Sequence, residues 1–309
     1  MRHRIPNAIL FASFILTLTM CAQPQVSRTD TGSSEAQQET ATDAPEKSLL
    51  YRISGNGLQQ PSYLYGTIHI ICPADFTVPD YVKGALEEAE VTVLELDMDD
   101  PSFMQQMQQN MVSPDMSNFA QNMDEADREK LDATLKKQYG PGIDQLGIMK
   151  PFVIQNMILV KYLPCEQQAS YEAEFIQLSE AQEQEVIGLE TVAFQFSVFD
   201  QIPAGQQVEW ITEMLNDSVG TINKFGEMVE VYKQKDVEGL NDLMLQDDQF
   251  DEYADLLLYD RNANWIPKME QIMSEQSAFI AVGAGHLGGD KGVLALLEGE
   301  GYTVEPVTE

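Results

Sequence analysis

Basic residues are scarce in this sequence of 309 residues, in which 18 Lys and Arg stand against 50 Asp and Glu. The formal net charge is therefore -32 at pH 7. Proteins that bind nucleic acids or anionic membrane surfaces need clusters of Lys and Arg. Because no such cluster occurs, the sequence argues against nucleic acid as a partner. It predicts contact with a membrane only through a lipid anchor at the N-terminus.

Cysteine is also scarce, with only Cys21, Cys72 and Cys165 in the chain. No Cys-x-x-Cys pair occurs, which argues against a zinc knuckle or a dithiol redox site. Two cysteines outside the cytoplasm often pair, so Cys72 and Cys165 are candidates for a disulfide. The alternative is that both are buried free thiols.

Long apolar runs are missing except near the N-terminus. A basic start at residues 2–4 precedes an apolar stretch over 9–20 that is too short to span a bilayer. This pattern predicts a signal peptide over residues 1–22. Cys21 is positioned to become the lipidated first residue of a mature lipoprotein, and cleavage after Ala22 is the alternative.

The signal is followed by a polar stretch, residues 23–47, which has almost no large apolar side chains. Such a segment cannot bury enough surface to offset the entropy of ordering, so we predict a disordered linker. Residues 48–309 are predicted to form the folded domain. We expect an exported protein, either a periplasmic, outer-membrane or cell-surface lipoprotein, or otherwise a secreted one.

The two ends of the domain share one order of elements. Each has a strand, a Gly-x-x-His motif, a helix and a second strand, and a largely helical stretch separates them. Strand–helix–strand units pair in parallel through right-handed crossovers. The sequence therefore predicts an α/β or α+β fold, with a mixed central sheet and a large helical insert. The predicted strands are 49–53, 63–70, 91–96, 185–189, 277–282 and 302–307.

The two Gly-x-x-His motifs are the most informative feature. Gly66 precedes His69 and Gly283 precedes His286, and the only other histidine, His3, lies in the predicted signal peptide. Ligand sites in parallel sheets form at the carboxyl ends of strands. We therefore expect both imidazoles to reach one crevice, where they could bind a metal or transfer protons.

Glu95 lies inside an otherwise apolar predicted strand. A buried carboxylate is costly unless it is paired or bound to a cation. Two histidines and one carboxylate form a competent ligand set for a divalent transition metal with an open position. His69, Glu95 and His286 are therefore the predicted metal ligands, and pairing of Glu95 with an arginine is the alternative.

Other polar residues, one of them (Glu190) at the end of a predicted strand, are candidates for the same site. Arg261, followed by Asn262, could orient Glu95 or bind a substrate carbonyl or carboxylate, unless it is exposed. Glu190 could be a general base or a further ligand, or it could cap a helix. Glu172 is a weaker candidate.

The motifs resemble those of the TraB/GumN family, relatives of the Tiki metalloproteases and, more distantly, of the ChaN-like haem-binding proteins. The resemblance implies that the paired histidines and a glutamate share one site. Because Tiki members act as metal-dependent proteases, the resemblance implies a protease that depends on manganese or cobalt. Many members have Gly-x-Asp where this chain has Ser-Tyr-Glu, which leaves the role of Glu172 open. The matching segments are 65–69, 94–97, 150–152, 170–172, 188–191, 261–265 and 282–289.

Two functions remain open. The first is a metal-dependent hydrolase that cleaves peptides or proteins outside the cytoplasm, with Glu95 or Glu190 accepting a proton and Arg261 assisting. The second is a non-catalytic protein that binds haem, a metal or a peptide in the same crevice. The usual signatures of serine hydrolases, zinc peptidases with His-Glu-x-x-His, and P-loop enzymes are missing from the sequence.

Overall fold

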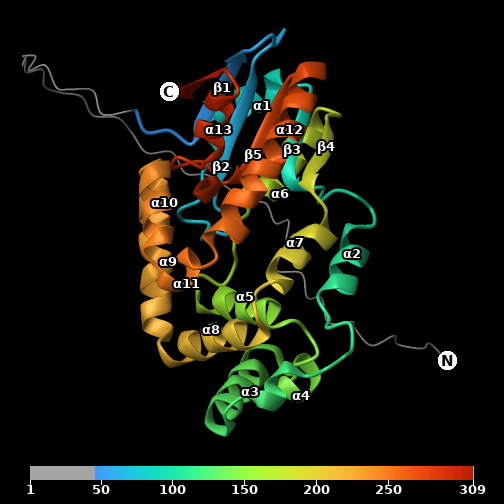
Figure 1. Ribbon diagram of the computed structural model, residues 1–309, viewed down its shortest axis with the longest axis vertical. Coiled ribbons are helices and arrows are strands. Elements are labelled where there is room, and N and C mark those ends of the chain that lie inside the picture. Colours follow the sequence, from blue (N-terminus) through green and yellow to red (C-terminus); the bar gives the residue numbers. More distant parts are fainter. Residues whose placement is uncertain (1–45, 309) are drawn as a thin grey trace, which may run out of the picture. The chain divides into compact units, whose positions relative to one another are not determined.

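The computed structural model describes residues 46–308 of the chain (Figure 1). Lys47–Glu309 form one compact unit. The predicted signal peptide, Cys21 and the predicted linker up to residue 45 lie outside the described residues. Within the described part, no helix is both long enough and apolar enough to cross a bilayer.

Six strands form one mixed sheet in the order β4-β3-β5-β2-β1-β6, which confirms the predicted mixed α/β class. β2, β5, β3 and β4 pair in parallel, and β1 runs antiparallel to both β2 and β6. The two strands that precede the histidine motifs are direct neighbours. The strands are β1 (Leu50–Gly55), β2 (Ser62–Thr67), β3 (Val91–Leu96), β4 (Glu185–Glu190), β5 (Ala278–Gly283) and β6 (Tyr302–Val307).

The central strands are covered on both faces. Every residue of β2 and β5 is buried, and so are the first five residues of β3. Burial of successive residues, which point to opposite faces, requires helices on each side of the sheet. The helices that cover it are α1 (Asp80–Glu88), α6 (Tyr171–Ala181), α12 (Asp260–Glu275) and α13 (Val293–Gly299). Figure 1 shows α12 crossing in front of the sheet.

The remaining helices lie between β3 and β5 in the sequence and make up the helical insert. Those before β4 are α2 (Phe103–Asn110), the 3₁₀ turn η1 (Phe119–Asn122), α3 (Glu125–Tyr139), α4 (Ile143–Leu146) and α5 (Pro151–Tyr162). Those after β4 are α7 (Val192–Asp200), α8 (Ala204–Asn216), α9 (Ser218–Lys233), α10 (Val237–Leu245), α11 (Asp248–Asp251) and the π-helical turn η2 (Asp255–Tyr259).

One local prediction needs correction. The strand predicted over 63–70 ends at Thr67, because pairing of β2 with β5 stops there and Ile71 bridges to Ala169 instead. Asp80 is the first residue of α1, and Pro79 holds the cap position without a side-chain bond. Asp124 caps α3, with its carboxylate accepting from the backbone of the first turn.

A disulfide joins Cys72 to Cys165, with an S–S distance of 2.06 Å. The bond links two segments 93 residues apart. Beside it, the backbone amide of Ile71 donates to Ala169 at 3.1 Å, and the amide of Ala169 donates back at 2.8 Å. The loop after β2 is thereby tied to the segment that leads into α6.

Reduction of this disulfide is expected to lower the free energy of unfolding by about 2–4 kcal/mol, because the unfolded chain regains the freedom of a long closed loop. Urea unfolding with and without a thiol reductant measures the change. A Cys72→Ser, Cys165→Ser variant is the control, since its unfolding should not respond to the reductant. An unchanged midpoint for the wild-type protein on full reduction would contradict the prediction.

Candidate functional site

Three polar side chains meet at the carboxyl ends of the parallel strands. His69 follows β2 by two residues, Glu95 is the penultimate residue of β3, and His286 ends the 3₁₀ turn η3 (Ala284–His286) that follows β5. A Cβ atom built on Gly283 would lie 3.3 Å from Nε2 of His69, 3.4 Å from Oε1 of Glu95 and 3.5 Å from Cδ2 of His286. The three side chains therefore lie close together beside Gly283.

The two motif glycines make this approach possible. A Cβ atom on Gly66 would lie 3.0 Å from the Cβ of Ala284, so β2 packs directly against the turn that carries His286. Gly283 forms the floor between the two imidazoles and Glu95, and a side chain there would crowd all three. Glycine is needed at both positions for close approach rather than for an unusual backbone angle.

Glu95 is buried and held by three donors. Its Oε1 accepts from the backbone amide of Gly283 at 2.9 Å, and its Oε2 accepts from Nη2 of Arg261 at 2.6 Å and from Nε2 of Gln195 at 3.1 Å. Desolvation raises the pKa of Glu95, but the charges of Arg261 and His69 outweigh it and hold this pKa well below its usual value. Glu95 is therefore ionised.

Arg261 is fixed by a second buried carboxylate. Its Nε and Nη2 donate to the two oxygens of Glu190 at 2.9 and 2.8 Å, and Nε1 of Trp265 donates to the same group at 2.8 Å. The pairing of Glu95 with an arginine, which the sequence left as an alternative, is thus present. Both oxygens of Glu190 accept hydrogen bonds from Arg261. The geometry therefore favours a role for Glu190 in holding Arg261 over the predicted role as general base or metal ligand.

His286 is held as one neutral tautomer. The amide nitrogen of Asn262 donates to the backbone oxygens of His286 and Lys291 at 3.2 and 2.9 Å, so its oxygen must face Nδ1 of His286, 2.6 Å away. Nδ1 therefore carries the hydrogen. Burial lowers the pKa of His286 to about 3. The lone pair on Nε2 is left to face Arg261, whose Nη1 lies 3.3 Å away.

His69 is oriented by Glu172, although its side chain is half exposed. Nδ1 of His69 lies 2.8 Å from Oε1 of Glu172, whose side chain is buried. Oε1 also accepts from the hydroxyl of Thr67 at 2.7 Å, and Oε2 accepts from the hydroxyl of Ser170 at 2.8 Å. Nε2 of His69 points toward Glu95, 3.7 Å from its Oε1. Although this chain has Ser-Tyr-Glu in place of Gly-x-Asp, the carboxylate of Glu172 still supports His69.

The charge of Glu172 controls the protonation of His69. Desolvation lowers the pKa of His69, but Glu172 and Glu95 outweigh it and raise this pKa to about 9. A Glu172→Gln substitution is expected to bring it back toward the ordinary value of about 6.5. Titration of the imidazole Cε1 proton by NMR measures the change. Glu174→Gln, in the same turn of α6, is the matched control and should leave the titration unchanged.

The same shift predicts a dependence of stability on pH. Because the pKa of His69 is higher in the folded state, the protonated imidazole stabilises the folded protein. This contribution is complete below the unfolded pKa of about 6.5 and is lost as pH rises toward about 9. The stability advantage of wild type over Glu172→Gln should therefore shrink across that interval. An advantage that grows with pH in urea unfolding would contradict the pairing of His69 with Glu172.

The side chains at the site include donor types that divalent transition metals accept, two imidazoles and a carboxylate. Nδ1 of each imidazole is held by Glu172 or Asn262, which is the arrangement that supporting residues impose on histidine ligands. Nε2 of His69 faces Glu95, whereas Nε2 of His286 faces Arg261. Among the described residues, however, no group of three His, Cys, Asp or Glu side chains surrounds a point as ligands of a bound ion would. The positive charge next to Glu95 comes from Arg261. The residues that would hold a metal are His69, Glu95 and His286.

Gln195 is the contact that sequence reasoning missed. It lies in the first turns of α7, where Thr191 caps the helix, and it reaches Glu95 from 100 residues away in sequence. No local pattern marks this glutamine as a site residue. Its position follows from the end of β4, because α7 starts directly after Glu190.

Comparison with known proteins gave one match. The family model described as "TraB/PrgY/gumN family" matches residues 49–306, which is nearly all of the described chain. The comparisons with curated proteins and with solved structures gave no significant match.

Proposed function

Because the chain belongs to the TraB/PrgY/gumN family, we propose that it is an exported, divalent-metal-dependent hydrolase of peptide bonds, anchored through Cys21 if that residue is lipidated. One observation carries the proposal. Both motif histidines have Nδ1 held by a side-chain acceptor. Nε2 of His69 points toward the ionised Glu95, and Nε2 of His286 keeps its lone pair and faces Arg261. Neutral imidazole nitrogens and a carboxylate are the donors that hydrolytic metal sites use.

In this proposal His69, Glu95 and His286 hold the metal. A bound divalent ion would polarise the scissile carbonyl and lower the pKa of a coordinated water. Oε1 of Glu95 accepts a single bond from Gly283 and keeps a lone pair for the crevice, whereas Oε2 is held by Arg261 and Gln195. The depressed pKa of Glu95 makes it a weak proton acceptor, so its main role is to supply negative charge.

Protonation of His69 sets the pH dependence of metal binding. A metal must replace the proton on Nε2, while Glu172 keeps the hydrogen on Nδ1. Because the pKa of His69 is raised to about 9, the apparent affinity for a divalent ion should increase as pH rises toward that value. An affinity that is constant between pH 6 and 9 would contradict His69 as a ligand.

Hydrolysis of a peptide library tests the activity. Purified protein is stripped with a chelator, and Mn²⁺ or Co²⁺ is then restored. Cleavage should return with the ion, and His69→Ala and His286→Ala should remain inactive at the same ion concentration. Glu305→Ala, an exposed carboxylate on β6, is the control and should retain activity. If the wild-type protein binds the ion but cleaves no peptide, the function is binding rather than hydrolysis.

A further inference from the structure

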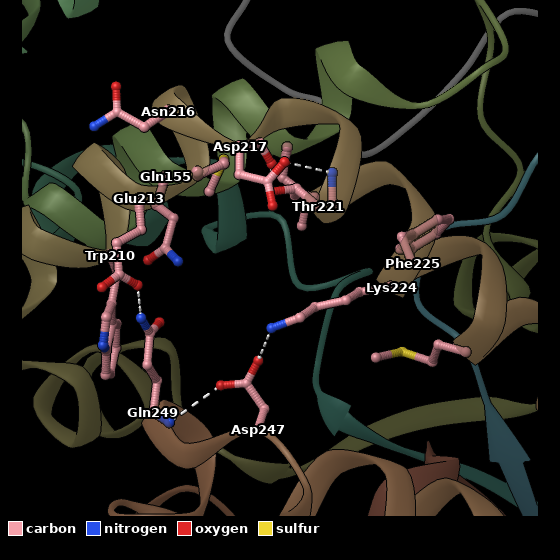
Figure 2. A pocket seen from close by; sticks show the side chains of 14 residues that line it. Gln155, Trp210, Glu213, Asn216, Asp217, Thr221, Lys224, Phe225, Asp247 and Gln249 are labelled. Atoms are coloured by element: carbon pink, nitrogen blue, oxygen red, sulfur yellow. Dashed lines mark hydrogen bonds and ion pairs between the residues drawn. The ribbon is translucent and has the colours of Figure 1, made fainter.

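A cavity of about 560 Å³ lies within the helical insert (Figure 2). Its walls come from α5, α8 and α9 and from the segment 247–249 at the start of α11. Within residues 46–308, no lining residue is hydrogen-bonded or ion-paired to His69, Glu95 or His286. The volume falls in the range of about 300–1,000 Å³ that is typical of ligand pockets.

The interior of the cavity is apolar and adaptable. Figure 2 shows Trp210 and Phe225 on opposite sides of the space. The indole of Trp210 is buried and packs edge-on against Tyr253, with the ring centroids 5.6 Å apart. Two methionines add flexible, polarizable surface, which can fit side chains of different shape. The apolar lining residues are Leu159, Trp210, Met214, Phe225 and Met228.

The mouth of the cavity is acidic. Three carboxylates, those of Glu213, Asp217 and Asp247, face one ammonium group, that of Lys224. Lys224 pairs with Asp247 at 2.7 Å, and the amide of Gln249 donates to Glu213. Both contacts cross from the walls to segment 247–249, as Figure 2 shows. Exposed ion pairs of this kind contribute little to stability. A cationic group of a ligand can therefore replace Lys224 beside Asp247 at a small cost in free energy.

Polar groups without net charge complete the rim. The side-chain amides of Gln155, Asn216 and Gln249 and the hydroxyl of Thr221 line the opening. Amides and hydroxyls both donate and accept hydrogen bonds, which suits the alternating N–H and C=O groups of a peptide backbone. An apolar interior, an acidic mouth and an amide-rich rim together match an apolar side chain flanked by a basic one on an extended chain.

We propose that this cavity binds a segment of a polypeptide substrate that presents an apolar side chain beside lysine or arginine. The identification of the ligand as substrate rests on the proposed function, whereas recognition by the cavity does not. The cavity would hold the substrate at a place separate from the histidine site. The carboxylates at its mouth would select basic over acidic segments.

Fluorescence of Trp210 reports occupancy directly, because the chain has two tryptophans and Trp265 is buried against Glu190. The probes are two peptides, acetyl-Lys-Leu-Phe-Lys-amide and acetyl-Glu-Leu-Phe-Glu-amide, titrated into the purified protein with excitation selective for tryptophan. The basic peptide should give a saturable change in emission, and the acidic peptide should bind at least about tenfold more weakly. Trp210→Phe should remove the fluorescence response.

Charge variants test the mouth. Glu213→Gln and Asp217→Asn should each weaken binding of the basic peptide by about two- to fivefold, the effect of one exposed charge pair. Asparagine preserves the cap that Asp217 gives to α9. Asp115→Asn, an exposed carboxylate that does not line the cavity, is the matched control and should bind like wild type.

Two results would overturn the proposal: no saturable response to the basic peptide, or equal affinity for the acidic one. A second variant guards against a local artefact of the fluorophore. Leu159→Arg places a cation in the cavity from a half-buried position and should abolish binding measured by calorimetry. His69→Ala should bind the basic peptide normally. If the wild type binds this peptide yet cleaves none, the proposed hydrolysis fails while the cavity assignment stands.

Discussion

Replacement of Arg261 with methionine is expected to lower the free energy of unfolding by about 3–5 kcal/mol. The side chains of its partners Glu95 and Glu190 are only 10% and 3% exposed, so the substitution leaves two buried carboxylates without their cation. An unpaired buried charge costs far more than the net value of the pair. Urea unfolding at neutral pH, followed by circular dichroism, measures the loss.

A matched arginine is available as the control. Arg52 pairs with Glu305 at 3.3 Å, but the two side chains are 41% and 58% exposed, so Arg52→Met should cost less than about 1 kcal/mol. Adding Glu190→Gln to Arg261→Met removes one of the stranded charges and should recover part of the loss. If Arg261→Met is as stable as Arg52→Met, the buried network does not have the energetic role described above.

The second large effect concerns metal affinity. His69→Ala, Glu95→Gln and His286→Ala each remove a proposed ligand and should weaken Mn²⁺ binding by more than about 100-fold. Glu172→Gln removes only the support of His69 and should fall within the about 10–100-fold range of such residues. Calorimetric titration with Mn²⁺ at fixed pH measures the affinity of each variant and so ranks them.

The acidic surface requires a control for weak binding elsewhere, because the chain carries 50 Asp and Glu. Titrations at raised ionic strength screen exposed carboxylates more than a buried site. Glu305→Gln should leave the strong binding unchanged. If Glu172→Gln loses more affinity than Glu95→Gln, then Glu172 rather than Glu95 is the ligand, and the proposed set is wrong.

Much of the fold could be predicted from the sequence because its signals are local. Apolar runs marked the strands, and their bounds were missed by only a few residues at the ends. The repeated strand and Gly-x-x-His order predicted that both imidazoles reach one crevice. The structure meets the condition for this, because β2 pairs with β5, with Tyr63 opposite Phe279 and Thr67 opposite Gly283. The meeting of His69, Glu95 and His286 follows from that strand order.

The parts that escaped prediction depend on contacts between distant segments. Gln195 reaches Glu95 only because α7 starts beside the end of β3, and a glutamine in a helix carries no signal of its own. The anchoring of Arg261 by Glu190 and Trp265 is similarly non-local. Arg261, Glu190 and Trp265 all lie in segments that match the family motifs. Side-chain geometry was needed to show that Glu190 holds Arg261 in place, which the sequence alone could not separate from a role as general base.

The most direct test of the central claim is to count the imidazole nitrogens bound to Mn²⁺ by electron spin-echo spectroscopy on the purified protein. The chain makes this count simple, because His69 and His286 are its only histidines besides His3. The account predicts two coordinated imidazoles in the wild-type protein and one in either His69→Ala or His286→Ala. Bound Mn²⁺ without any imidazole nitrogen coupling would place the ion on surface carboxylates and contradict a metal site at the paired histidines.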